Sequence, residues 1–556
     1  MKLATLNINR LQHILAEDQN RWMTEPDVLT KDAPPWQRQI MRVLTEILFY
    51  GNPKTHHIIK GPRRSGKSTL LWQTLQKLRE EYQIQDERLI YFQMDHPELI
   101  REPLGNIVEA LLEIASDATS SAPLYLFIDE IAASEGWEGW MKMFSDGSKP
   151  VRILASSSAF TYSNGGDSGI GRWATHTLMP CNFIEYVEMR DKHSKNLPSW
   201  CWTWHDTLKG RLESVPAGIA TDPILKQYAS DFILFGGYPQ CISNSEPSYS
   251  NVTSAHEILR GIAELVTEHD IPNMQQIRDR RGLRLLLHSC AVRMCTQTLP
   301  SKIGKPAGFK NAETTSTYLE LIEMSDLISR IRPYVEPEKE ESTEEEQQKS
   351  YAPRQLKILF RDTAMASAIR RTSNSTLQNN DTKGQAYENI IGSSLKELAD
   401  TTGAELNFWR YNEEHESDFI FDAEGPGPLA VEVSSNISHK RTGLRKAVKK
   451  MPQFQNSAYL LSPETPIIHT RNSVDGVGEI PIFVFLLACS AQAIQSSLIR
   501  GGHIKGQNYR VSQTTQELFE RPSQQQQPLF KDGDIVFLTE HEAEKAQAKQ
   551  LIKPAR

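Results

Sequence analysis

The 556-residue sequence has no Cys-x-x-Cys pair and no long apolar run. Its six cysteines are scattered, so we expect neither a zinc site nor a disulfide framework, and the thiols suit a reducing cytoplasm. The longest apolar stretch, IPIFVFLLACSA from Ile480, is too short to span a bilayer and is better interpreted as a buried strand that runs into a helix. The polar N-terminus does not resemble a signal peptide. We therefore expect a cytoplasmic protein with no membrane partner.

The chain also lacks an excess of positive charge, because its formal net charge is −7. Nucleic-acid binding requires clustered lysine and arginine, so any such contact has to use a local patch. The length is too great for one ordinary hydrophobic core, and about two to four domains are expected.

The clearest motif is a phosphate-binding loop in HHIIKGPRRSGKSTLLWQTLQKL. Ile58 and Ile59 predict a short strand before the loop, and leucines at helical spacing predict a helix after it. Such a loop closes backbone N–H groups around phosphates at a helix N-terminus. We expect Lys67 to reach the β- and γ-phosphates and Ser68 to hold Mg²⁺. The predicted ATP-binding residues are Gly61, Pro62, Arg63, Arg64, Ser65, Gly66, Lys67, Ser68, Thr69 and Ser156.

A second part of the same site is predicted in APLYLFIDEIAASEGW. Residues 124–128 form a continuous apolar run, which is typical of a strand buried on both faces. Acids at the carboxyl end of a central strand lie where open α/β sheets bind ligands. We expect Asp129 to hold Mg²⁺ and Glu130 to polarise the attacking water, although two adjacent acids could also begin a solvated helix.

Two further segments are weaker candidates for this site. A strand at residues 151–155 leads into three serines whose hydroxyl groups, that of Ser156 first, could touch the γ-phosphate or the water, although serines are also common in turns. Arg172 lies farther along and could meet a phosphate of its own or of a neighbouring subunit, although most exposed arginines are simply solvated. Residues 89–92 fit as another strand of the sheet.

These motifs together resemble a bacterial and archaeal family of AAA-type ATPases that carry the domain of unknown function numbered 4143 (DUF4143). The matching segments, in order, are GPRRSGKST, YLFIDE, ILASSSA, GR…MPCNFIEY, FGGYP, KILFRDTAMA, AYENIIGSSLKEL, HESDFIF and GPLAVEVSS. The resemblance covers roughly residues 35–490. It implies a P-loop ATPase, then a winged helix, then a small nuclease-like α/β domain of the PD-(D/E)xK type. The sequence departs from the family at Ala155-Ser156 and at Ser434, and about sixty C-terminal residues have no counterpart.

The middle of the chain combines an insertion with the expected winged helix. Trp200, Trp202 and Trp204 alternate within the insertion, which suggests one face of a strand or an apolar lid and more often marks a packing element. Helices are predicted from Gly282, with Val292 on its apolar face, and from Asn311, and residues 326–334 and 354–362 read as two strands of a wing. The acidic segment between those strands repels DNA and favours a structural or protein-facing role, while Lys302, Lys305 and Lys310 leave a DNA contact open.

The nuclease-like site depends on three carboxylates and a missing lysine. The resemblance places Glu388 on a helix, with Asp418 and Glu432 on adjacent strands, as Mg²⁺ ligands. Ser434 stands where such an enzyme has lysine, and a neutral hydroxyl cannot lower the cost of forming hydroxide. A displaced cation from the basic run could replace it; the candidates are Lys440, Arg441, Arg445, Lys446, Lys449 and Lys450. We therefore expect a nuclease fold without cleavage, in which that run could still contact DNA or a protein; active Mg²⁺-dependent cleavage is the alternative.

The resulting prediction is an α/β ATPase of several domains with ATP and Mg²⁺ as cofactors. The predicted parts are an N-terminal segment (1–34), an AAA-type core (35–240, insertion about 190–225), a helical region and winged helix (241–362, acidic wing tip 336–350), a nuclease-like DUF4143 domain (363–487) and a C-terminal extension (488–556). We expect an oligomer that couples its nucleotide state to DNA in a mobile-element, defence or genome-maintenance system. The alternative is a regulatory ATPase that binds proteins and never touches DNA.

Overall fold

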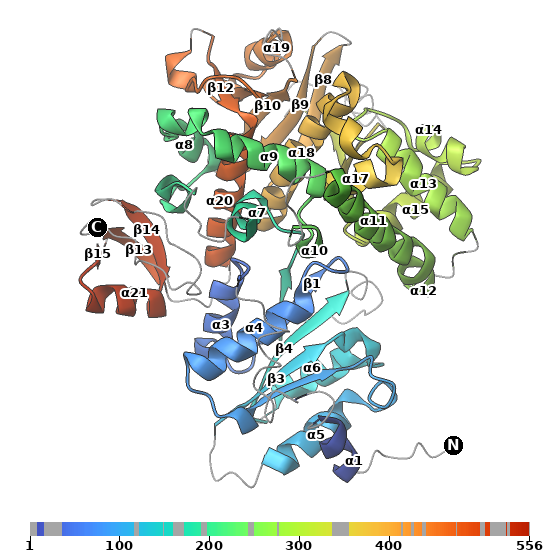
Figure 1. Cartoon of the computed structure of the whole chain (residues 1–556), viewed down its shortest axis with the longest axis vertical. Helices are drawn as coiled ribbons and strands as arrows, with labels where there is room; N and C mark the ends of the chain where they lie inside the picture. The colour runs from blue at the N-terminus through green and yellow to red at the C-terminus, as the bar shows by residue number, and fades with distance from the viewer. Residues whose placement is uncertain are drawn as a thin grey trace, which may run out of the picture.

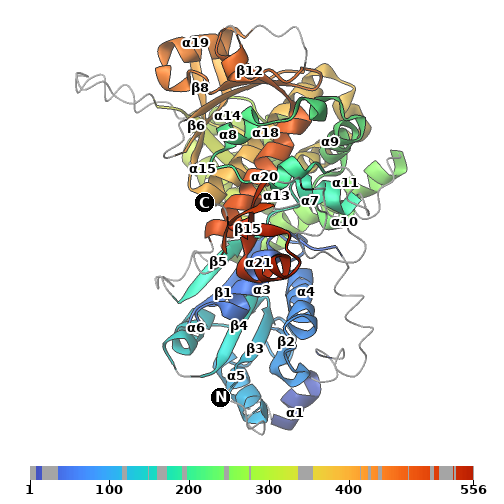
Figure 2. The same ribbon diagram turned by 90° about the vertical axis from the view of Figure 1, so that its left-hand side faces the viewer.

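The chain forms two lobes and a small C-terminal unit, which we describe from a computed structural model. The structure describes residues 8–15, 20, 36–115, 122–147, 149–158, 172–190, 197–242, 249–274, 277, 279–335, 355–412, 415–423, 428–435, 441–473, 475–500, 506–511, 530 and 534–554. In Figure 1 the N-terminal lobe lies below the second lobe. The small C-terminal unit lies beside the region where the two lobes meet (Figures 1 and 2).

The N-terminal lobe is built on a parallel sheet of five strands in the order β2-β3-β4-β1-β5. The strands are β1 (His56–Gly61), β2 (Leu89–Gln93), β3 (Leu124–Asp129), β4 (Val151–Ser158) and β5 (Trp173–Thr177). The four strands predicted from the sequence are confirmed. Strand β4 continues through the three serines, so these residues belong to the sheet and not to a turn.

Alternate residues of each strand pack on opposite faces of this sheet. Ile59 and Leu154 face α3 (Met41–Tyr50) and α4 (Lys67–Glu80). Ile58 and Ile153 face α5 (Leu104–Ala115), α6 (Trp137–Asp146) and α1 (Ile8–His13). Burial on both faces explains the continuous apolar run of β3, whose six residues are all buried.

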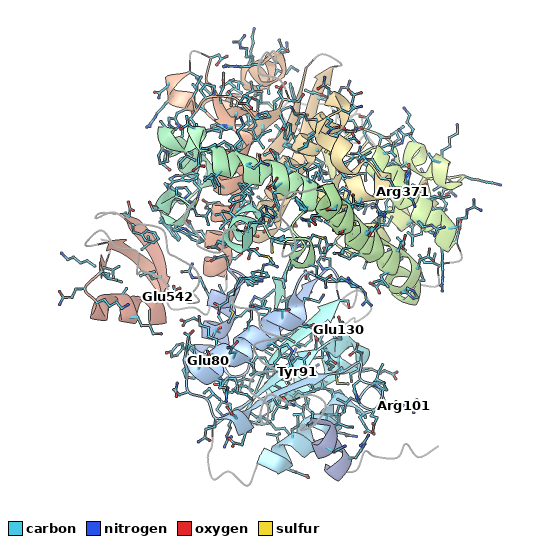
Figure 3. All side chains as sticks on the ribbon, viewed as in Figure 1. Glu80, Tyr91, Arg101, Glu130, Arg371 and Glu542 are labelled. Atoms are coloured by element: carbon cyan, nitrogen blue, oxygen red, sulfur yellow. The ribbon has the colours of Figure 1, made fainter. Side chains whose placement is uncertain are left out.

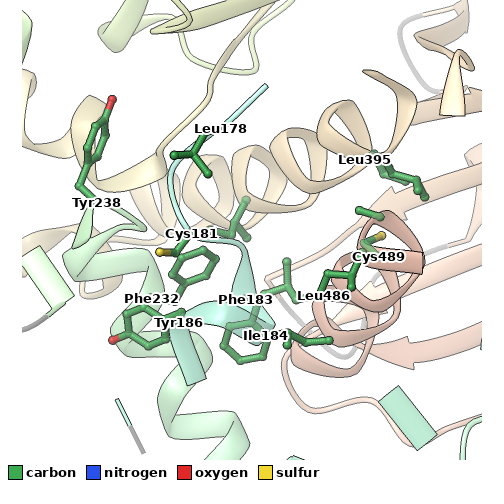
Figure 4. Packing of buried hydrophobic residues seen from close by; sticks show 14 of the residues in the cluster. Leu178, Cys181, Phe183, Ile184, Tyr186, Phe232, Tyr238, Leu395, Leu486 and Cys489 are labelled. Atoms are coloured by element: carbon green, nitrogen blue, oxygen red, sulfur yellow. The ribbon is translucent and has the colours of Figure 1, made fainter. Parts of the chain in front are cut away.

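The segment that leaves the sheet joins the two lobes through α7 (Phe183–Arg190). Figure 4 shows Phe183, Ile184 and Tyr186 among residues of α18 (Asn380–Thr402) and α20 (Ile482–Arg500). Since one buried cluster contains side chains of both lobes, the lobes share a hydrophobic core.

The predicted insertion forms short helices and contains no strand among its described residues. Trp200 and Trp202 lie in a 3₁₀ turn (Ser199–Trp202) and are buried, so the strand interpretation of the tryptophans is wrong and their role in packing is confirmed. The insertion contains α8 (Leu208–Glu213) and ends at the start of α9 (Pro223–Phe235), which is followed by α10 (Pro239–Ile242).

A group of helices follows the insertion. They are α11 (Tyr249–Leu265), the π-helical turn η7 (Val266–Asp270), α12 (Ile271–Met274), α13 (Arg280–Val292), α14 (Pro300–Gly304), the 3₁₀ turn η8 (Lys305–Ala307), α15 (Ala312–Met324) and α17 (Thr363–Arg370). Asn311 caps α15 as predicted, because its side chain accepts a hydrogen bond from Thr314 N. Val292, predicted on the buried face of α13, is instead 50% exposed.

The C-terminal half contains a mixed sheet of seven strands in the order β12-β11-β10-β9-β8-β6-β7. The strands are β6 (Ile328–Pro333), β7 (Lys357–Phe360), β8 (Glu405–Asn412), β9 (His415–Asp422), β10 (Leu429–Val433), β11 (Ala458–Ser462) and β12 (Val477–Pro481). Helix α19 (Thr442–Lys450) lies between β10 and β11 in the chain. The predicted hairpin β6–β7 is present and joins this sheet through β8, so the sheet crosses the boundary predicted at residue 362.

The apolar stretch near the C-terminus and the tail that follows it both form regular secondary structure. The apolar stretch at residue 480 is a strand end, β12, that runs into α20, as predicted, and none of the described helices is long and apolar enough to cross a membrane. The tail forms β13 (Gly506–Val511), β14 (Ile535–Thr539), α21 (Glu540–Ala548) and β15 (Ile552–Pro554). The predicted acidic wing tip lies outside the described residues.

Candidate functional site

The phosphate loop connects β1 to α4 and depends on two glycines. Gly61 has a φ of 156°, and a Cβ atom at this position would lie 2.1 Å from the carbonyl oxygen of Leu178. Gly66 has a φ of 98° and precedes the first residue of α4. A larger residue at position 61 would collide with neighbouring backbone, and one at position 66 would be strained, so the loop requires glycine at both points.

Lys67 lies inside this loop. Its side chain is 6% exposed, and Nζ donates hydrogen bonds to Gly61 O (3.0 Å) and Pro62 O (3.1 Å). Burial lowers the pKa of Lys67, and the nearby Glu130 and Asp129 oppose that shift. The ammonium group is therefore held beside the two acids predicted to share its site. Ser68, on the first turn of α4, is exposed.

Hydroxyl groups hold both acids at the carboxyl end of β3. Asp129 is 4% exposed and accepts hydrogen bonds from Tyr91 OH (3.1 Å) and from Ser156 Oγ. Glu130 has a φ of 51° and its Oε2 accepts hydrogen bonds from Ser158 Oγ (2.8 Å) and Ser158 N (3.2 Å). A non-glycine residue in the left-handed region is costly, and such strained residues cluster at functional sites. Figure 3 labels Tyr91 and Glu130 in the N-terminal lobe.

The serines of β4 therefore contact the acids. Ser156 is fully buried, donates to Asp129, and accepts a hydrogen bond from Glu130 N at 3.0 Å. In this arrangement its hydroxyl faces the carboxylate and is not open to a phosphate. The contact of Ser158 with Glu130 was not predicted, and the run of three serines after a buried strand was its only signal in the sequence.

Arg172 lies at the other end of the sheet. Its carbonyl oxygen accepts a hydrogen bond from His56 N at 3.0 Å, at the start of β1, whereas the phosphate loop follows the end of β1. Five residues of extended strand separate these ends by about 16 Å. Its side chain pairs with Asp146 at 3.3 Å. Arg172 therefore does not reach the phosphates of its own site, which corrects that part of the prediction; a role in a neighbouring subunit stays a prediction.

Residues of the second lobe contact the outer part of the loop. Arg63 forms an ion pair with Asp270 of η7 at 2.5 Å, and Arg64 donates to Gln240 of α10 at 2.9 Å. The guanidinium group of Arg63 is 45% exposed, and the Asp270 carboxylate is 7% exposed. The phosphate site is thus connected directly to the helices that follow it in the chain.

Arg38 is a functional candidate that the sequence analysis missed. It donates to Ser65 O of the loop (3.0 Å), to Met179 O (2.9 Å) and to Glu185 (2.9 Å). Its side chain is 7% exposed. Arg38 joins the loop to the segment between the lobes, and a lone arginine 23 positions before the motif gives no sequence signal of that role.

Two of the three predicted nuclease-like residues, Glu388 and Asp418, come together around a lysine. Lys357 of β7 is 3% exposed, and its Nζ lies 2.7 Å from Glu388 Oε1 and 3.3 Å from Asp418 Oδ1. The ammonium group also lies 5.6 Å and 5.7 Å from the ring centroids of Phe408 and Phe419. Although burial opposes the charge, the two carboxylates raise the pKa of Lys357 above its usual value. Lys357 thus supplies a cation where Ser434 does not.

The remaining groups of this cluster are held by backbone. Asp418 Oδ2 accepts a hydrogen bond from Val433 N at 2.8 Å, and Glu432 Oε2 accepts one from Leu444 N at 3.3 Å. Burial, followed by the charge of Asp418, raises the pKa of Glu388 to about 8. Among the residues that the structure describes, no group of three or more histidine, cysteine or acidic side chains is placed to hold a metal ion.

The basic run proposed to supply the displaced cation has other partners. Arg441 pairs with Glu479 and, at 3.7 Å, with Asp475. Arg445 pairs with Asp475 at 2.8 Å. Lys440 lies outside the described residues. The cation found beside Glu388 and Asp418 comes from β7, so the expectation that these arginines replace the lysine is wrong.

Two family models match this chain. Residues 54–187 match an AAA domain, and residues 226–376 match a domain of unknown function numbered 8612. The N-terminal lobe therefore contains an AAA-type P-loop domain, which is a nucleotide-binding fold. The resemblance to the 4143 family is not confirmed, because the match in the second half is to this other domain.

Two uncharacterized proteins are similar to parts of this chain. The uncharacterized protein MJ1544 of Methanocaldococcus jannaschii is 25% identical over 241 residues, which cover 42% of this chain and 47% of that protein. An uncharacterized protein of Haemophilus influenzae is 24% identical over 296 residues, which cover 52% of this chain and 66% of that protein. The chain thus spans about half to two thirds of the length of these relatives.

Solved structures also match, at low TM-scores. The Walker-type ATPase PABY2304 of Pyrococcus abyssi gives a TM-score of 0.33 at 15% identity, covering 60% of this chain and 94% of that chain. The ORC2 protein of Aeropyrum pernix, in ADPNP–ADP complexes, gives a TM-score of 0.32 at 12% identity, covering 62% of this chain and 96% of that chain.

Proposed function

We propose that the chain binds ATP with Mg²⁺ and hydrolyses it. Lys67 and the loop amides hold the β- and γ-phosphates, while Ser68 and Asp129 hold the metal ion. Glu130 orients the attacking water. The observation that carries this proposal is the burial of Lys67 beside Asp129 and Glu130.

The residues present fit a magnesium-bound nucleotide. Asp129 and the exposed Ser68 offer the hard oxygen ligands that Mg²⁺ prefers, and the metal supplies charge neutralisation when bound. Ser158 holds the Glu130 carboxylate by two hydrogen bonds. This support holds the Glu130 carboxylate in place.

Nucleotide binding and turnover test the proposal separately. Lys67→Ala is expected to weaken binding of a fluorescent ATP analogue at least tenfold, because it removes the cation facing the phosphates. Glu130→Gln is expected to retain binding and to lose phosphate release by about 10²-fold. Lys77→Ala, on the same helix α4, is the matched control and should change neither quantity. Hydrolysis that survives in a Lys67→Ala, Glu130→Gln double variant would refute the proposal.

We further propose that the nucleotide state controls the contact between the lobes. Arg63 pairs with Asp270 of the second lobe, and its place in the phosphate loop would set it beside the phosphates of a bound nucleotide. Phosphate oxygens compete with Asp270 for this guanidinium group, since both are good bidentate partners of arginine. Binding of ATP would therefore loosen the second lobe from the loop, and release of phosphate would restore the contact.

The nuclease-like part of the C-terminal half is proposed to be inactive. The order α18–β8–β9–β10–α19–β11, with Glu388, Asp418 and Glu432, supports a PD-(D/E)xK-like domain. The ammonium group of Lys357 lies between two of these carboxylates, in the place where a metal ion would have to bind them both. A buried pair of this kind is costly to break, so Mg²⁺ does not displace it.

A plasmid-nicking assay tests this absence of cleavage. The wild type is expected to leave supercoiled plasmid intact in Mg²⁺ and in Mn²⁺, at the level of Asp418→Ala. Nicking by the wild type that disappears in Asp418→Ala would show that the site cleaves. The assay does not depend on ATP turnover, so the two activities are judged independently.

A further inference from the structure

A basic surface covers one face of α13 and the turn beside it. Exposed arginines lie on the first two turns of α13, and exposed lysines follow in and after α14. The residues of this surface, called the α13 surface below, are Arg280, Arg281, Arg284, His288, Lys302, Lys305 and Lys310. The helix lies at the periphery of the second lobe (Figure 1).

Packing places the lysine-bearing turn alongside α13. Ser289 Oγ donates to Ile303 O at 2.8 Å, which fixes the end of α14 against the middle of the helix. A Cβ atom on Gly282 would lie 3.0 Å from the ring of Phe309, so the following segment reaches the start of α13. The segment that carries the lysines at 302, 305 and 310 is therefore packed against α13, the helix that carries the arginines.

Few acids oppose this charge. Glu268 pairs with Arg284 at 3.3 Å and accepts a hydrogen bond from Arg280 through its carbonyl oxygen. The Arg284 side chain is 58% exposed, and an exposed pair contributes little. Asp279 uses a carboxylate oxygen to cap Gly282 N, and Glu313 lies at the start of α15. Among the described residues named here, six permanent cations stand against three acids, so this part of the surface is positive although the net charge of the chain is −7.

The two arginines at helix α19 contrast with this surface. Arg441 and Arg445 at α19 pair with Asp475 and Glu479. Their charge is largely neutralised within the protein, whereas Arg281 and the three lysines of the α13 surface are exposed with no acidic partner within 4 Å among the described residues.

We propose that the α13 surface binds the phosphate backbone of a nucleic acid. The charged residues of the helix, from Arg280 to His288, extend over about 12 Å, a length that meets several successive phosphates. Guanidinium groups bind phosphates in bidentate geometry. Leu285 and Val292 are the large apolar side chains of α13 that are exposed, which is too little apolar area for insertion into a membrane. The binding uses charge and is therefore not sequence-specific.

The same surface is connected to the phosphate loop through η7. Within this five-residue turn, Glu268 contacts Arg284 and Asp270 contacts Arg63. A π-helical turn inside a helical run often marks a functional site. Only this connection rests on the proposed ATP-dependent switch; the binding surface itself does not.

The experiment measures fluorescence anisotropy of a labelled duplex of about 30 base pairs, and of an RNA of about 30 nucleotides, with the full chain and no nucleotide. The wild type is expected to bind at least one probe at about 50 mM salt and to lose at least tenfold in affinity at about 200 mM salt. The Arg281→Glu, Lys305→Glu double variant should lose at least tenfold at the lower salt. The Lys449→Glu, Lys450→Glu variant on α19 makes the same charge change and should lose less than threefold.

Three outcomes would overturn the proposal. These are the absence of binding to both probes at the lower salt, an equal loss in the two double variants, and binding to phosphatidylserine vesicles without binding to either probe. Circular dichroism and ATP hydrolysis of the double variants, expected to match the wild type, exclude misfolding. Preserved hydrolysis with failed probe binding would refute this inference alone, while bound probe without hydrolysis would refute the proposed function alone.

Discussion

At the scale of single residues, Lys357 decides the character of the second candidate site. The three carboxylates by themselves indicate a metal centre, and Ser434 only weakens that indication. A lysine from a different strand, buried between Glu388 and Asp418, gives these acids a cation that the protein itself supplies. The cluster thereby joins β7, α18 and β9, and its role is to hold these elements together.

The first prediction concerns this lysine. Lys357→Met keeps the aliphatic volume and leaves two buried carboxylates without their partner, so it should lower the free energy of unfolding by about 3–5 kcal/mol. Urea titration measures this loss. Added Mn²⁺ should restore part of it in Lys357→Met and none in the wild type, because the removed ammonium group opens the space between the acids. Equal stability of the variant and the wild type would contradict the role of Lys357.

Glu397 of α18 gives a prediction of pH dependence. Burial, followed by repulsion from Glu185, raises its pKa to about 7. An acid with a raised pKa stabilises the fold below the pKa of the unfolded chain, and this contribution disappears as the pH rises through about 7. Glu397→Gln mimics the neutral form and keeps the contact with Asn182. It should be close to the wild type near pH 4.5 and more stable by about 3 kcal/mol near pH 8.

Urea titrations of Glu397→Gln at several pH values between these limits measure the difference. The matched control is Glu320→Gln on α15, which makes the same change at an exposed position and should show no such dependence. A constant difference between Glu397→Gln and the wild type over the whole pH range would contradict the titration of this group.

At the scale of elements, two short segments organise the nucleotide site. Strand β4 lies between β3 and β1 and places Ser156 and Ser158 against the acids that end β3. The turn η7 brings Asp270 to the loop although the two partners, Arg63 and Asp270, are 207 positions apart in the chain. The site is therefore assembled from the edge of one sheet and one turn of a distant helix.

The prediction at this scale is that η7 restrains the loop. Asp270→Asn removes the charge that holds Arg63, so ATP no longer has to compete for the guanidinium group. The dissociation constant for ATP should fall by about two- to fivefold, as expected for a partly exposed ion pair. Titration with a fluorescent analogue measures it. Glu268→Gln, on the same turn but facing α13, should leave the constant unchanged; an equal effect of both variants would disprove the restraint.

At the scale of the whole molecule, the C-terminal unit fastens onto its own chain. The guanidinium group of Arg42 on α3 makes two hydrogen bonds of 2.8 Å to Glu542 of α21. Trp204 N donates to Ile535 O at 2.7 Å, so β14 also contacts the insertion. Figure 3 labels Glu542 on the side of this unit that faces the N-terminal lobe. The tail is thus held by internal contacts with the ATPase lobe and the insertion.

The corresponding prediction uses hydrogen exchange. Arg42→Met removes a bidentate, partly buried pair and should reduce protection of the backbone amides at residues 534–554 by about tenfold, which corresponds to about 1.4 kcal/mol. Lys545→Met is the control, because Lys545 lies 4.0 Å from Glu81 in an exposed pair and should change protection little. Unchanged exchange in Arg42→Met would show that this pair does not hold the unit in place.

The sequence by itself determined the phosphate loop, its strand and helix, the acid-bearing strand, and several helices and strands of the C-terminal half. These features follow from local patterns: glycine spacing, apolar periodicity and capping residues act over a few neighbouring positions. The tertiary structure alone decided the contacts of Ser158, Arg38, Asp270 and Lys357, and the distance of Arg172 from the phosphates. Each of these depends on which strands lie side by side and which ends of them meet, and no pattern within a short window records that arrangement.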